Sequence, residues 1–262
     1  MSKFSKKMKQ KYKETNRKSI RVYLTVRILV IICLVFQILA GNIGNAALCV
    51  ASLLLFTLPT FISDKFKIEI PGVLEGIIYL FIFSSAILGE INNFYRIIPF
   101  WDTILHTLNG FLCAGIGFSL IDLLNQNSKN LNLSPVYVAI VAFCFSMTVG
   151  VLWEFYEYSA DTFTKTDMQK DRIVKSISSV ALNEKGENKP VVINDIQKTE
   201  IYSKDGVTTI NGGYLDIGIN DTMKDLLVNL VGAVVFSIIG FLYIKNRDKY
   251  KFAKNFIPIK NE

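Results

Sequence analysis

Residues 136–158 read VYVAIVAFCFSMTVGVLWEFYEY, a stretch of eighteen uncharged residues followed at once by Glu154 and then by Glu157. A helix needs about 20 mostly apolar residues to cross a hydrocarbon core of about 30 Å. This stretch is long enough, and its two glutamates would lie near one end of the span. Ionisable residues at membrane depth are costly and are candidates for function. The stretch therefore predicts a membrane-spanning helix that carries functional carboxylates.

Outward from this stretch, five more apolar segments of similar length follow the same pattern. The six predicted spans are Val22–Ala40, Ile43–Ile62, Gly72–Gly89, Trp101–Leu124, Val136–Tyr158 and Thr222–Ile244. The chain is 51% hydrophobic and only 19% charged, with a mean hydropathy of +0.35, which is unusual for a soluble domain of this length. The sequence predicts an all-α integral membrane protein with six transmembrane helices.

The distribution of lysine and arginine predicts the orientation of these spans. Nine of these residues precede Val22, and six lie between Lys245 and the last residue. Cytoplasmic loops and tails carry the excess of positive charge in membrane proteins. Both termini are therefore predicted to be cytoplasmic in a multi-pass protein of the cell membrane, with the lipid bilayer as its partner. The net charge of +7 does not indicate nucleic-acid binding, because the basic residues lie beside apolar segments.

The spans divide the chain into five predicted regions. A basic cytoplasmic arm (1–21) precedes helices one to five (22–160), and an insertion (161–220) separates them from helix six (221–244) and a basic cytoplasmic tail (245–262). The insertion is polar and charge-balanced, with alternating stretches such as 173–177 and turn residues at 188–190 and 204–206. We expect a small β-rich extracytoplasmic insertion, and a disordered loop is the alternative.

Acidic residues and the single histidine gather at the predicted outer ends of the last three spans. They follow helical spacings, so each set lies on one face of its own helix. Because the orientation was assigned from lysine and arginine alone, it is an independent observation that all of them fall near the same membrane face. The predicted metal ligands are Asp102, His106, Glu154, Glu157, Asp221 and Asp225, and the secondary candidates are Asp161, Asn109, Asn229 and Glu90.

Carboxylates that lie close together repel one another unless cations intervene. A divalent metal ion is the simplest solution, and an oxygen-rich set with one imidazole favours Mg²⁺, Mn²⁺, Fe²⁺ or Zn²⁺. The alternative is a structural polar network, since Asp102 and Asp221 also stand where helix N-caps belong.

Three blocks of the sequence also resemble a known family. They are Trp101–His106, Trp153–Glu157 and Asp221–Asp225, the last followed by Gly232-Ala233. Together they resemble the YjdF-like family of uncharacterised bacterial membrane proteins, whose pattern is D-x-x-x-H, then E-x-x-E, then D-T-x-x-D. This chain departs from the pattern by a longer insertion before Asp221, which leaves the role of Asp216 open. The resemblance supports the site and implies no particular reaction.

Three functions fit these observations. The first is a metal-dependent hydrolase or transferase that acts on a lipid or phosphoester at the outer face. The second is a transporter or sensor of divalent cations or protons, which is less favoured because the inner halves of the last three spans are apolar apart from scattered serine and threonine. The third is a structural membrane protein whose acidic residues only stabilise the helix bundle.

Overall fold

The computed structural model describes the backbone of residues 3–127 and 132–260, and it divides into two compact units. The first unit contains the chain up to Gly150 together with the residues from Val228 onward. The second unit contains residues 151–227. Helices α7 and α8 each begin in one unit and end in the other. Each unit is described separately below.

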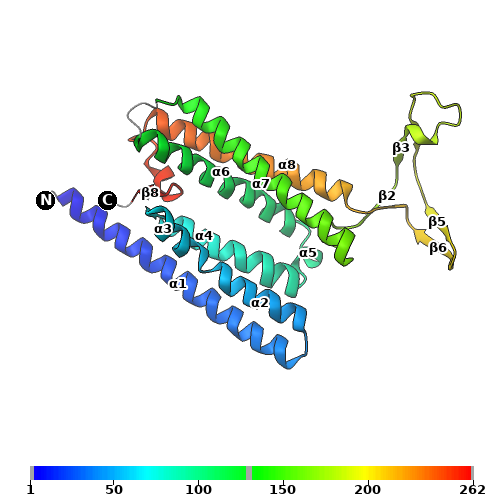
Figure 1. The fold of residues 1–262 in the computed structure, drawn as a ribbon, viewed down its shortest axis with the longest axis horizontal. Helices are drawn as coiled ribbons and strands as arrows, with labels where there is room; N and C mark the ends of the chain where they lie inside the picture. The colour runs from blue at the N-terminus through cyan, green and yellow to red at the C-terminus, as the bar shows by residue number, and fades with distance from the viewer. Residues whose placement is uncertain (1–2, 128–131, 261–262) are drawn as a thin grey trace. The chain divides into compact units, whose positions relative to one another are not determined.

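The first unit consists of helices with short connections (Figure 1). Its elements are α1 (Lys3–Leu39), α2 (Ile43–Leu55), α3 (Leu58–Phe66), β1 (Ile68–Glu69), α4 (Gly72–Ile82), the π-helix η1 (Phe83–Ile91), α5 (Phe94–Ile97), α6 (Trp101–Asn127), much of α7 (Pro135–Thr164) and α8 (Ile219–Lys245), the 3₁₀-helix η3 (Lys251–Asn255) and β8 (Ile259–Lys260).

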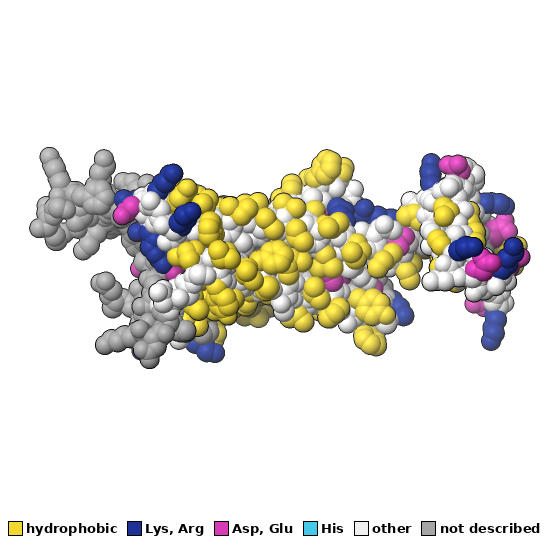
Figure 2. Space-filling view, turned by 90° about the horizontal axis from the view of Figure 1, so that it is seen from above, with side chains coloured by type: hydrophobic (Ala, Val, Ile, Leu, Met, Phe, Trp, Pro, Cys, Tyr) yellow, Lys and Arg dark blue, Asp and Glu magenta, His cyan; other side chains and the backbone are white. Residues whose placement is uncertain are grey.

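Six helical segments among the described residues are long and apolar enough to cross a membrane, which confirms the six predicted spans. They are Arg17–Leu39, Ile43–Lys65, Gly72–Ile91, Trp101–Asn125, Pro135–Thr164 and Ile219–Lys245. Hydrophobic side chains cover much of the helical surface in the view of Figure 2, as a lipid-facing surface requires.

Two of the spans are not continuous α-helices. The second breaks between α2 and α3, where Pro59 stands in the first turn of α3 and cannot donate a backbone hydrogen bond. The third changes from α4 to the π-helix η1, and the carbonyl of Ser84 in η1 accepts a hydrogen bond from the Trp101 indole at 3.2 Å. A wider helix leaves some carbonyls free for such partners.

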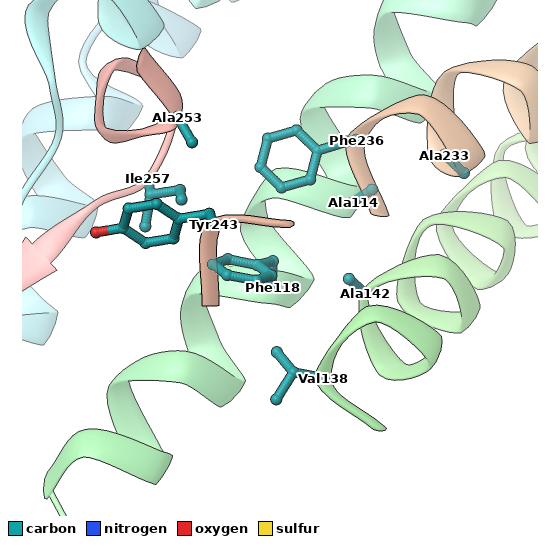
Figure 3. Packing of buried hydrophobic residues seen from close by; sticks show 9 residues of the cluster. All are labelled: Ala114, Phe118, Val138, Ala142, Ala233, Phe236, Tyr243, Ala253 and Ile257. Atoms are coloured by element: carbon teal, nitrogen blue, oxygen red, sulfur yellow. The ribbon is translucent and has the colours of Figure 1, made fainter. Parts of the chain in front are cut away.

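Two buried clusters hold the first unit together. One joins α1, α2, α4 and η1 and includes Val30, Phe56 and Tyr79. The Glu75 carboxylate lies beside this cluster, where it accepts hydrogen bonds from Ser19 at 2.6 Å and Tyr79 at 2.9 Å. The other cluster joins α6, α7 and α8 to the C-terminal segment (Figure 3); its buried members are Ala114, Phe118, Val138, Ala142, Ala233, Phe236, Tyr243, Ala253 and Ile257.

The second unit contains the outer turns of α7 and α8 and the polar segment between them. Its strands are β2 (Arg172–Val174), β3 (Ile177–Ser179), β4 (Val191–Ile193), β5 (Lys198–Ser203), β6 (Gly206–Asn211) and β7 (Tyr214–Asp216), with the 3₁₀-helix η2 at Val180–Leu182. They form three two-stranded antiparallel sheets, β2–β7, β3–β4 and β5–β6. In the longest of these sheets Lys198 is opposite Asn211 and Ser203 is opposite Gly206. That this segment lies outside the cytoplasm remains a prediction.

Candidate functional site

Helices α6 and α8 approach each other closely in the first unit. The side-chain amide of Asn109 on α6 donates a hydrogen bond to the Asn229 side chain on α8 at 3.1 Å. A methyl group added at Gly110 would overlap the Asn229 carbonyl oxygen, and one added at Gly232 would overlap the carbonyl oxygen of Thr107. The two backbones therefore touch at this crossing, which only glycine permits.

Helix α7 joins the same crossing. The Ser146 hydroxyl donates a hydrogen bond to the carbonyl oxygen of Gly110 at 2.8 Å. The Asn229 amide lies against Gly150, where an added methyl group would be 2.7 Å from its nitrogen, and Asn229 is only 1% exposed. Asn109 and Asn229, both predicted as secondary candidates, thus belong to one buried polar contact among three helices.

The predicted ligands lie one or two turns beyond this crossing along continuous helices. His106 precedes Asn109 by three residues, Asp225 precedes Asn229 by four, and Glu154 follows Gly150 by four. Residues three or four apart share a helix face. The name candidate cluster is used below for Asp102, His106 and Asp225, which offer two carboxylates and one imidazole, the donor types that divalent metal ions accept.

On α6, Asp102 and His106 face each other across one helical turn. His106 Nε2 lies 3.4 Å from an Asp102 carboxylate oxygen, and the two side chains are 13% and 18% exposed. A carboxylate in this place orients an imidazole ring and favours a defined tautomer. The pair is mostly buried at the end of a membrane span. Helical spacing alone therefore holds the two donor groups close together.

On α7, the two glutamates are buried, with Glu154 4% and Glu157 7% exposed. The indole of Trp153 donates a hydrogen bond to Glu157 Oε1 at 2.8 Å, which fixes the position of that carboxylate. One of the two glutamates thus has a defined side-chain partner on its own helix. Their role as metal ligands remains a prediction.

On α8, the two aspartates have different surroundings in the second unit. Asp221 is 2% exposed, and it accepts hydrogen bonds from the backbone of Lys170 at 3.0 Å and from the Arg172 guanidinium at 2.7 Å. These contacts tie the segment after α7 to the first turn of α8. Asp225 is 1% exposed and lies 3.6 Å from the Lys224 ammonium group. Asp221 is therefore engaged by the segment after α7, whereas Asp225 has a lysine neighbour on its own helix.

The remaining acidic residues lie near the ends of α7, β7 and η1. Asp161 accepts hydrogen bonds from Thr166 and from the backbone of Met168 and Gln169, each at 2.7 Å, and so closes the turn after α7. Asp216 accepts one from the backbone of Asn220 at 2.9 Å at the start of α8, which gives this residue a capping role. Glu90 is exposed at the end of η1.

The sequence did not single out several residues that contact the candidates. Ser146 is an uncharged residue within an apolar span. Arg172 and Gln169, which donates to the Thr222 hydroxyl at 2.5 Å, lie in a polar segment without periodicity. No spacing rule links such residues to a helix about 50 positions further on, so only the folded chain reveals them.

Residues 22–246 match a protein family described as "Predicted membrane protein (DUF2238)". An uncharacterized protein of Thermotoga maritima is 32% identical over 93 residues, which are 36% of this chain and 46% of that protein. The chain thus covers less than half the length of this relative, and no solved structure matches it. All six predicted spans and the three acidic blocks lie within the family match. The chain belongs to this family of membrane proteins.

Proposed function

We propose that the protein binds one divalent metal ion through Asp102, His106 and Asp225 and uses it in hydrolysis or group transfer on a phosphoester. The observations that carry the proposal are the Asp102–His106 pair on α6, which contains the only histidine of the chain, and the buried carboxylate of Asp225 on α8. The resemblance to the YjdF-like family agrees with this choice, because its three blocks contain the same residues.

The chemistry of these donors fits a divalent cation. Two carboxylates and one imidazole suit Mg²⁺, Mn²⁺, Fe²⁺ or Zn²⁺, and three protein ligands leave positions for water or substrate. Asp225 is 1% exposed, and a buried carboxylate requires a cation or hydrogen-bond donors. Lys224 supplies part of that charge at 3.6 Å, so the metal ion would share Asp225 with it.

A bound divalent ion would activate a water molecule and polarise a phosphoryl oxygen. The chain's own residues supply the rest of the proposed chemistry. Glu154 lies one turn from the crossing and is our candidate for the base that takes the proton of that water. Arg172, which is held by Asp221, and Lys224 are cations that can pair with an anionic substrate.

The inner half of the bundle favours this function over transport. Below the Asn109–Asn229 contact, the buried cluster of α6, α7 and α8 consists of apolar and aromatic side chains such as Phe118, Phe236 and Tyr243. A path for an ion through these three helices would need polar groups along it. Among the described residues, the buried polar side chains there include Ser119, Asp122 and Ser237, and Asp122 is paired with Arg247, so polar groups along such a path are few.

The test measures Mn²⁺ binding to the purified full-length protein by electron paramagnetic resonance, together with phosphate release from a short-chain phosphatidic acid. Wild type should bind about one ion and release phosphate, and Asp225→Asn should lose both. Asp161→Asn should retain both, because Asp161 only closes the turn after α7. Ion binding without metal-dependent release would support the sensor alternative, and no binding would refute the proposed site.

A further inference from the structure

The chain remains in contact with the helices of the first unit after α8 ends. After Lys245, Arg247 turns back and its guanidinium contacts the Asp122 carboxylate of α6 at 2.6 Å, while it also lies 4.8 Å above the ring of Tyr243. The following residues fold into η3 and then pair as β8 with β1, with Lys260 opposite Ile68. This basic tail, which the sequence suggested would lie in the cytoplasm, is thus packed against the helices over much of its length.

The apolar side chains of this segment enter the buried cluster. Ala253 is fully buried and Ile257 is 3% exposed, and both belong to the same cluster as Phe118, Phe236 and Tyr243 (Figure 3). The Phe256 ring meets the Phe111 ring edge-on, with 5.5 Å between their centres. By contrast, the nearby Phe252 is 50% exposed.

The position of Phe111 shows how deep the segment reaches. Phe111 is ten residues after Trp101 in a span that ends at Asn125. At a rise of 1.5 Å per residue, Phe111 lies about 15 Å from one end of the span and about 21 Å from the other. Phe256 therefore contacts α6 near the middle of the hydrocarbon layer. Non-helical backbone is tolerated at such depth only where protein surrounds it or where it lines a cavity.

The contact of Arg247 with Asp122 gives the segment a charged anchor. Asp122 is 2% exposed and belongs to a membrane span, so loss of the guanidinium would remove a cation from a buried carboxylate. Arg247 itself is partly exposed, with 38% of its side chain accessible. The anchor lies close to the surface that carries the termini, where water and competing charges can reach it.

We propose that residues 247–258 form a re-entrant lid, held by Arg247 and Asp122, which fills an apolar cavity on the side of the termini. The lid closes this side of the helix bundle, and its removal would open a cavity lined by Phe111, Phe118, Phe236 and Tyr243. This inference does not depend on the metal ion, because none of its contacts involves the acidic cluster.

The test uses a single reporter cysteine in full-length protein. The free cysteines can first be replaced by alanine; they are Cys33, Cys49, Cys113 and Cys144. Phe111→Cys then places a single thiol against Phe256. A charged methanethiosulfonate is added in turn to each side of membrane vesicles. With the lid in place the thiol should react slowly from both sides. Phe256→Ala or Arg247→Gln should raise the rate at least tenfold from the side of the termini, and Phe252→Ala should not.

A second experiment does not depend on variants in which the packing of the lid is weakened. Phe111→Cys combined with Phe256→Cys should cross-link with a short bifunctional thiol reagent, and Phe111→Cys with Phe252→Cys should not. Equal rates for Phe256→Ala, Arg247→Gln and Phe252→Ala, or failure of the first pair to cross-link, would overturn the lid.

Discussion

At the scale of single residues, Asp221 and Asp225 show that two aspartates one turn apart on α8 have different partners. Asp221 is engaged by Arg172 and by the backbone of Lys170, whereas Asp225 lies 3.6 Å from the Lys224 ammonium group. We infer that Asp221 is an anchor for the segment after α7 and that Asp225 is a ligand. The sequence analysis assigned these two residues the same role, because helical spacing is the only relation between them that a sequence contains.

Substitutions can distinguish the anchoring role of Asp221 from the ligand role of Asp225. Asp221→Asn and Arg172→Gln should each loosen the segment after α7, at a cost of about 1 kcal/mol because the guanidinium is partly exposed. Both variants should show faster proteolysis between residues 165 and 218 and should still bind Mn²⁺. If Asp221→Asn abolished binding while Arg172→Gln left it intact, Asp221 would be a ligand after all.

At the scale of elements, the six spans could be predicted because length and apolar composition determine which helices enter a bilayer. Their internal irregularities could not. The π-helix η1 has an ordinary apolar sequence, and its contact with Trp101 depends on tertiary packing. The packing of the C-terminal segment could not be predicted either, because it depends on Phe256 and Ile257, which stand among lysines that indicate a cytoplasmic tail.

The packing of α6 on α8 leads to a test with two glycines. Gly110→Ala should lower the free energy of unfolding by about 1–3 kcal/mol, because its methyl group would overlap the Asn229 carbonyl and force the helices apart. Gly76→Ala on α4 is the matched control. A methyl group there meets no atom within 4 Å, so this variant should be neutral or up to about 1 kcal/mol more stable. Thermal melting in detergent measures both, and equal melting temperatures would contradict the close crossing.

At the scale of the whole molecule, the orientation in the membrane is still a prediction from lysine and arginine. Reporters fused after Lys67, Lys129 and Glu262 should give cytoplasmic signals, and one inserted near Lys189 should give an external signal. A cytoplasmic signal at Lys189 would place the acidic cluster on the inner side and would exclude action on outer-face substrates.

The candidate site was predictable in part for the same reason as the spans. Helical periodicity predicted that Asp102 and His106 share one helix face, and the structure shows this pair, whereas their meeting with Asp225 remains a prediction. Spacing alone could not rank the six predicted ligands. That ranking depends on Arg172 at Asp221 and Trp153 at Glu157, which are contacts that only the folded chain contains.

The most direct measurement is elemental analysis of the purified full-length protein, combined with its melting temperature before and after chelation. A metal ion that binds only the folded state stabilises it by about 2.7 kcal/mol at a hundredfold excess over Kd. Wild type should therefore contain about one divalent ion per chain and melt earlier after chelation. His106→Ala and Asp225→Asn should contain almost none and melt at one temperature with or without chelator. A wild type without stoichiometric metal, whose melting does not respond to chelation, would show that the acidic residues form a structural network.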